Sequence, residues 1–144
     1  MRRLILKERE GYRRNQDNQR SLKGKHRTMA DGGLRHIALL ARDLKTTEKF
    51  YTEILGLEVA FRHPPSMIFL RTPGATDLLN FVRSNERPSG NQGLEHIGFK
   101  VTPAALKRME KKFKAHDIAI EGRRGKSAIY ISDPNGYQIE YYCD

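Results

Sequence analysis

Four residues of this chain have the types and the spacing of a metal-binding site. His36 and His96 lie 60 residues apart in two similar segments, LRHIAL and LEHIGF. The same spacing relates Asn80 in the segment LLNF to Glu140 in the segment QIEY. The chain therefore contains a duplicated module with a histidine near its start and a polar residue near its end. Two imidazoles and one carboxylate with open coordination positions form a set that binds Fe(II), Mn(II), Zn(II) or Ni(II).

Strand periodicity supports this interpretation of the two histidines. Residues i and i+2 share a face of a strand, so His36 lies with Ala38 and His96 with Gly98. These small neighbours leave room for an ion and a substrate. Either histidine alone is better explained as a core side chain with its hydrogen bonds satisfied. Their recurrence at one offset, with Glu140 at the equivalent end of the second module, favours metal ligands.

Further residues on the predicted faces are candidates for catalysis or substrate binding. We expect catalytic roles for Glu140, Asn80 and Tyr142, which lie near the ends of the two modules. Asn80 could bind weakly through its carbonyl oxygen, hold a metal-bound water, or be a hydrogen-bonded filler. Tyr142 could donate to a substrate oxygen or simply pack. Lys100, on the predicted face of His96, could meet an anionic substrate or be a surface lysine.

The elements that must position these residues follow the same order in both modules, strand–helix–strand–strand–strand. Asp43 and Thr102 are predicted helix caps, Pro103 occupies a first helical position, and Gly56 ends the first helix. The predicted strands are residues 34–40, 57–62, 67–71 and 77–83, then 94–101, 118–121, 127–131 and 137–142. The predicted helices begin at residues 43 and 102. The turn Asp133–Gly136 precedes the last strand.

Length and composition indicate one globular domain preceded by a basic segment. Residues 1–30 hold ten Lys or Arg against three Asp or Glu, whereas residues 31–144 are nearly balanced in charge. We expect 1–30 to be a disordered tail or an expression leader. We expect 31–144 to be a single domain, with module one at 34–83, a linker at 84–93 and module two at 94–142.

The composition also bears on compartment and partners. The sequence has one cysteine, Cys143, so it cannot form an intrachain disulfide, and this fits a reducing cytoplasm. No apolar run approaches the roughly 18 residues of a membrane helix, so no membrane partner is expected. A nucleic-acid partner would depend on the basic segment alone and is not favoured, because no aromatic residues interleave with the basic helix face.

Several short motifs resemble those of the vicinal oxygen chelate superfamily, which includes glyoxalases, extradiol dioxygenases, fosfomycin-resistance and bleomycin-resistance proteins. They are HIAL with RDL, FY followed by LGL, EHIGF, and DPNGY leading into IE, and they span residues 34–142. The resemblance implies an α+β fold of two tandem βαβββ modules that form a half-open, eight-stranded cup. It also implies that His36, His96 and Glu140 occupy the metal-ligand positions.

The resemblance implies a metal-dependent enzyme that is like glyoxalase (lactoylglutathione lyase) or like a dioxygenase. Its substrate would be a small molecule that chelates a divalent Fe, Mn, Ni or Zn ion through neighbouring oxygens, and the protein would be a homodimer. Asn80 departs from the glyoxalase pattern, which has a carboxylate there. The alternatives are a fosfomycin-type thiol transferase and a metal-free drug-binding protein of the bleomycin-resistance type.

Overall fold

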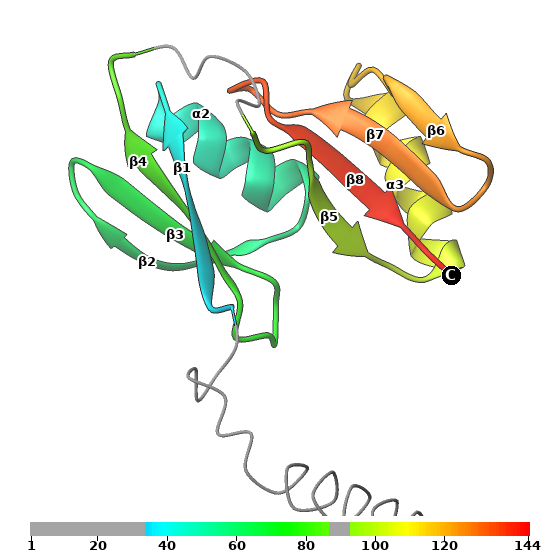
Figure 1. The fold of residues 1–144 in the computed structure, drawn as a ribbon, viewed down its shortest axis with the longest axis horizontal. Coiled ribbons are helices and arrows are strands. Elements are labelled where there is room, and N and C mark those ends of the chain that lie inside the picture. Colours follow the sequence, from blue (N-terminus) through cyan, green and yellow to red (C-terminus); the bar gives the residue numbers. More distant parts are fainter. Residues whose placement is uncertain (1–33, 87–92) are drawn as a thin grey trace, which may run out of the picture. The chain divides into compact units, whose positions relative to one another are not determined.

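The computed structural model describes residues 34–86 and 93–144, which fold into two modules of the same topology (Figure 1). The elements of module one are β1 (His36–Ala41), α2 (Leu44–Lys49), the π-helix η1 (Phe50–Ile54), β2 (Glu58–His63), β3 (Met67–Arg71) and β4 (Leu78–Arg83). The elements of module two are β5 (Ile97–Lys100), α3 (Pro103–Ala115), β6 (Gly122–Arg124), β7 (Ala128–Ser132) and β8 (Gln138–Tyr142).

Each module builds one four-stranded sheet with the same strand order. The first sheet runs β1-β4-β3-β2 and the second runs β5-β8-β7-β6. In both sheets the first and last strands of the module pair in parallel, and the other neighbours are antiparallel. The parallel pair places the histidine segment beside the strand that carries Asn80 or Glu140. The predicted pair of βαβββ modules is therefore confirmed, with the described strands divided between two sheets.

The predicted helix boundaries are confirmed by their capping contacts. The Asp43 side chain accepts from the backbone N–H of Thr46, and Thr102 accepts from that of Ala105. Gly56 adopts a left-handed φ of 81°, as a glycine that terminates a helix does. The last turn of the first helix widens into η1, which no 3.6-residue periodicity would reveal.

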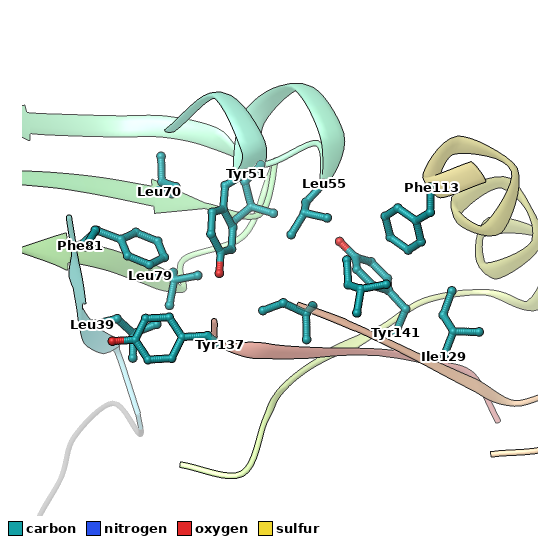
Figure 2. Close-up of a cluster of buried hydrophobic side chains, with 14 of the residues drawn as sticks. Leu39, Tyr51, Leu55, Leu70, Leu79, Phe81, Phe113, Ile129, Tyr137 and Tyr141 are labelled. Atoms are coloured by element: carbon teal, nitrogen blue, oxygen red, sulfur yellow. The ribbon is translucent and has the colours of Figure 1, made fainter. Parts of the chain in front are cut away.

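A cluster of buried apolar side chains draws on both modules, as Figure 2 shows. Tyr51 from η1 and Tyr141 from β8 both belong to it. Polar contacts also join the modules. The Tyr51 hydroxyl donates to Asp133 Oδ2 at 3.0 Å, and Asn135 Nδ2 donates to Thr47 Oγ1 at 3.1 Å. The loop before β8 therefore holds the helix of module one through buried hydrogen bonds.

Two predicted strands differ from those observed. Residues 118–121 are not a strand, because the backbone N–H of Ile118 donates to Phe113 and closes the end of α3. The short strand β6 begins only at Gly122. The first strand of module two is also shorter than predicted, so that His96 lies immediately before β5.

Some predictions concern residues outside the described part of the chain. These are the disordered tail or leader at 1–30 and the middle of the linker, residues 87–92. Across residues 34–86 and 93–144, no helix combines the length and the apolar character that crossing a membrane requires.

Candidate metal centre

Two of the three predicted metal ligands meet in module two. His96 Nε2 lies 3.2 Å from Glu140 Oε2. The parallel pairing of β5 with β8 causes this approach, because Gly98, two residues after His96, pairs directly with Glu140. Glu140 is only 6 % exposed, although it lies on the sheet face opposite the core residues Ile139 and Tyr141. A carboxylate buried to this degree requires a charged or hydrogen-bonding partner.

Tyr130 and Arg124 complete the surroundings of this carboxylate. The Tyr130 hydroxyl donates to Glu140 Oε1 at 2.7 Å, and Arg124 Nη2 lies 3.4 Å from the same oxygen. This hydrogen bond, with a smaller contribution from burial, raises the pKa of Tyr130 above its ordinary value. Tyr130 therefore remains a proton donor near neutral pH, and a cationic and a neutral donor converge on one carboxylate oxygen.

Neither Tyr130 nor Arg124 was predicted as a site residue from the sequence. Tyr130 faces Glu140 across the antiparallel pair β7–β8. The turn centred on Asn135 determines this register, since residues equally distant from a hairpin turn lie opposite each other. The spacing of Tyr130 and Glu140 around the predicted turn was the signal that could have revealed the contact.

Gly98 creates open space beside the carboxylate. A Cβ atom built on Gly98 would lie 3.4 Å from Tyr142 Cε1 and 3.5 Å from Glu140 Oε2. A larger side chain would therefore fill the region in front of Glu140. Tyr142, the third predicted catalytic residue, lies at the edge of this space with its ring half-buried. Lys100, a candidate for meeting an anion, pairs instead with Asp144 at 2.5 Å.

The far side of the His96 ring faces a carboxylate. Its Nδ1 atom lies 2.5 Å from Glu95 Oε2, although the approach is not aligned for a hydrogen bond. Histidines that bind a metal through one ring nitrogen commonly present the other to a carboxylate, which fixes the tautomer and the ring orientation. The surroundings of His96 therefore leave Nε2, the atom that faces Glu140, as the nitrogen for coordination.

The equivalent positions of module one lie in the other sheet. His36 is the first residue of β1 and is exposed, and Ala38 pairs directly with Asn80 on β4. Asn80 is 3 % exposed, and its Oδ1 atom has no hydrogen-bond partner among the described residues. An unpaired buried acceptor is costly, so a hydrogen-bond donor beside this atom would be stabilising.

The predicted ligand set is not assembled within one chain. Within residues 34–86 and 93–144, no group of three His, Cys, Asp or Glu side chains lies close enough to hold a metal. His96 and Glu140 are adjacent, whereas His36 does not join them. The pair nevertheless fits a divalent ion, because it offers an imidazole nitrogen and a buried carboxylate oxygen beside a space that a glycine keeps open.

Comparison with known proteins identifies the family of this chain. The family model "Glyoxalase/Bleomycin resistance protein/Dioxygenase superfamily" matches residues 33–141. The uncharacterized protein YaeR of Escherichia coli K12 is 29% identical over 119 residues, which cover 74% of this chain and 92% of that protein. Metallothiol transferase FosB of Staphylococcus haemolyticus is 25% identical over 115 residues, which cover 76% and 82% of the two chains.

A solved structure shares the fold. The glyoxalase/dioxygenase from Nostoc punctiforme superposes with a TM-score of 0.67 at 23% identity, and the match covers 81% of this chain and 96% of that one. At this level of identity the likeness extends to the architecture alone.

Proposed function

Because the chain belongs to the glyoxalase/bleomycin resistance protein/dioxygenase superfamily, we propose that it is a metal-dependent enzyme. Its substrate is a small molecule that binds the metal through two neighbouring oxygens. The observation that carries this proposal is the buried pair of His96 and Glu140, 3.2 Å apart beside the space that Gly98 leaves.

The third ligand in this proposal is His36 of a second copy of the chain. His36 is exposed on the sheet of module one, and no described His, Cys, Asp or Glu completes a group of three with His96 and Glu140. Two copies related by a two-fold axis would each contribute His36 to the other's pair, which gives two equivalent sites per dimer. The proposal therefore includes a homodimer.

The metal would supply Lewis-acid catalysis, which stabilises negative charge that develops on a substrate oxygen. The protein's own groups act around that oxygen. Arg124 lies beside Glu140 and offers a positive charge to an anionic or strongly polarised substrate group, while Tyr130 holds the Glu140 carboxylate in place by donating its one hydroxyl hydrogen to it. Tyr142 closes the edge of the same space.

Asn80 influences which reaction is favoured. An amide cannot accept a proton from carbon near neutral pH, so Asn80 cannot serve as the base of a glyoxalase-type isomerisation. In a lyase, isomerase or dioxygenase reaction at this site, another group, such as Glu140 or a bound water, must transfer the proton. Asn80 would instead act as an acceptor through Oδ1, which has no donor within residues 34–86 and 93–144.

Thiol transfer to an anionic epoxide of the fosfomycin type is the second candidate. Two observations favour it, namely the similarity to metallothiol transferase FosB and the placement of Arg124 and Tyr130 beside Glu140. Addition of a thiol to an epoxide needs charge stabilisation at the departing oxygen. It needs no carboxylate base at the position of Asn80.

The test is turnover with defined metals and a fixed panel of substrates. Protein loaded separately with Mn(II), Ni(II), Zn(II) or Fe(II) is assayed with the methylglyoxal–glutathione adduct, with fosfomycin plus a thiol, and with catechol plus oxygen. We expect turnover of one class that requires added metal and that Glu140→Gln abolishes. The control variant Glu121→Gln, which alters an exposed glutamate that accepts a hydrogen bond from Ser132, should retain the metal-dependent turnover. Binding of these compounds without metal, unaffected by Glu140→Gln, would contradict the proposal.

A further inference from the structure

A groove on module one lies between α2 and the hairpin of β2 and β3, on the face of the sheet that does not carry Asn80. The groove is lined in part by Ile68 of β3, which pairs with Phe81 on β4 and is buried in the core with it. Asn80 is the strand neighbour of Phe81, so its side chain points to the opposite face of the sheet. Asn80 pairs with Ala38, whose face His36 shares. The groove is therefore separate from the proposed metal site.

Two adjoining hollows make up the groove. One has a volume of about 370 Å³ and the other a volume of about 450 Å³, and Leu44, Lys45 and Pro65 line both of them. Sites for small molecules have volumes of roughly 300–1,000 Å³. Each hollow is therefore large enough for part or all of a small ligand, and the shared residues make the two hollows continuous.

The smaller hollow has an apolar lining between two walls that are tied together. Leu44 of α2 and Met67 of β3 are half-buried there, beside the exposed ring of Pro65. Arg62 of β2 donates to both carboxylate oxygens of Glu48 on α2, from Nε at 3.0 Å and from Nη2 at 2.6 Å. A two-point pair of this kind fixes geometry as well as distance. The apolar hollow is therefore formed before any ligand binds.

The larger hollow is lined by an excess of positive charge. Arg42, Lys45 and Arg83 line it and are exposed. Within residues 34–86 and 93–144, none of these three side chains forms an ion pair with a carboxylate. Asp43 lines the same hollow, but its carboxylate accepts from the backbone N–H of Thr46 at 2.9 Å and so caps α2. Three cations and one engaged carboxylate favour an anionic ligand, since guanidinium groups match the geometry of carboxylates.

We propose that this groove is a second ligand site, which binds a small amphipathic carboxylate. The carboxylate head lies among Arg42, Lys45 and Arg83, and the hydrocarbon chain covers Leu44 and Met67 in the adjoining hollow. The inference goes beyond the proposed function and does not depend on it, because no metal ligand lines the groove.

Charge complementarity selects this occupant over the chain itself. Residues 1–30 hold ten Lys or Arg against three Asp or Glu, so this segment would bring like charge to a basic groove. Residues 31–144 are nearly balanced in charge, so a second copy offers no general excess of negative charge either. A ligand with one anionic end and one apolar end matches the two hollows.

The test is titration of the isotope-labelled full chain with sodium octanoate, followed through the amide chemical shifts in nuclear magnetic resonance spectra. We expect saturable shifts centred on Leu44, Lys45 and Met67, while the amides of Tyr130 and Glu140 stay in place. Hexanoate should bind about fourfold more weakly, because it lacks two methylene groups that an open groove buries by about half. Octanol has the same chain without the charge, and it should also bind more weakly than octanoate.

Charge variants test the head of the site. Arg83→Glu reverses one of the three charges and should weaken octanoate binding by about fivefold or more, the effect of an exposed ion pair lost and a repulsion added. Arg42→Gln is a milder second variant and should weaken it by about twofold or more. The matched control is Lys107→Glu, which makes the same change of net charge at an exposed lysine of α3 and should bind octanoate as the wild type does.

Three results would overturn the inference and leave the proposed function standing. The first is the absence of saturable shifts at any concentration of octanoate below micelle formation. The second is a set of shifts centred on Tyr130 and Glu140 rather than on the groove, which would place the anion beside Arg124. The third is equal weakening by Arg83→Glu and Lys107→Glu, which would mean that only the overall charge of the protein matters.

Discussion

Mixing two inactive variants should restore metal sites if two copies of the chain share each site. The variant His36→Ala keeps His96 and Glu140, and the variant His96→Ala keeps His36. Each alone lacks a ligand in every site and should bind metal weakly. In a mixed dimer, one site combines His36 from the second variant with His96 and Glu140 from the first, and it is complete. The other site lacks both histidines.

The stoichiometry fixes the size of the effect. Random pairing of equal amounts makes half of the dimers mixed, and one of the two sites in each mixed dimer is complete. About one quarter of all sites are therefore restored in the mixture, and about one half in purified mixed dimers. Loss of one ligand commonly weakens a site severely, so the background from the single variants should be small.

The assay is co-expression of the two variants with different affinity tags that do not bind metal, purification of mixed dimers and measurement of tightly bound Co(II). The matched control pairs His36→Ala with His116→Ala, which changes an exposed histidine at the end of α3 and leaves one intact site per mixed dimer. If mixed dimers of His36→Ala with His96→Ala bind no more Co(II) than the single variants, the shared site is wrong.

The remaining predictions concern stability and ligand positioning. Tyr51→Phe removes a buried hydrogen bond to Asp133 and should lower the free energy of unfolding by about 1–3 kcal/mol in urea titrations. Tyr141→Phe, whose buried hydroxyl has no partner in the described part of the chain, should cost nothing or stabilise. Burial raises the pKa of Asp133 in the folded protein above its ordinary value of 3.8. The folded state therefore binds the proton of this carboxyl more tightly than the unfolded state does. The resulting stabilisation is fully present below pH 3.8 and is lost as the pH rises through the folded-state pKa. The melting temperature of the wild type relative to Asp133→Asn should therefore fall as the pH rises above 3.8. Glu95→Gln should weaken metal affinity by about 10–100-fold, measured by competition with a chelator, because Glu95 faces the outer nitrogen of His96.

Each of these predictions has an outcome that would contradict it. Equal losses of stability in Tyr51→Phe and Tyr141→Phe would mean that the Asp133 contact contributes nothing specific. If the difference in melting temperature between the wild type and Asp133→Asn stayed constant across the pH range, titration of the Asp133 carboxyl would not affect stability. Unchanged affinity in Glu95→Gln would show that the ring of His96 is oriented by other contacts.

The fold was predictable because local signals agree with the duplication. The caps at Asp43 and Thr102 and the terminating Gly56 each act within a few residues, and the structure has all three. The 60-residue repeat then places equivalent strands in equivalent sheets. The π-helix and the shift of β6 to Gly122 were not predictable, because tertiary packing and the end of α3 determine them.

The candidate site was predictable in part. Strand alternation places Glu140 and Gly98 on one face, and the parallel pairing of β5 and β8 brings His96 to Glu140. The roles of Tyr130 and Arg124 depend on cross-strand register, which residue types alone do not reveal. The repeat also does not indicate whether His36 approaches His96 and Glu140 of the same chain.

The most direct test of the metal site is the metal content of protein purified without chelators and without a metal-binding tag, measured by plasma mass spectrometry. With His36, His96 and Glu140 as ligands, the wild type should carry about one divalent ion per chain, as a three-ligand site of this kind would. His96→Ala should lose the ion while keeping its fold, and His116→Ala should keep both. Full occupancy in His96→Ala, or a wild type that binds no metal even when titrated, would contradict the account.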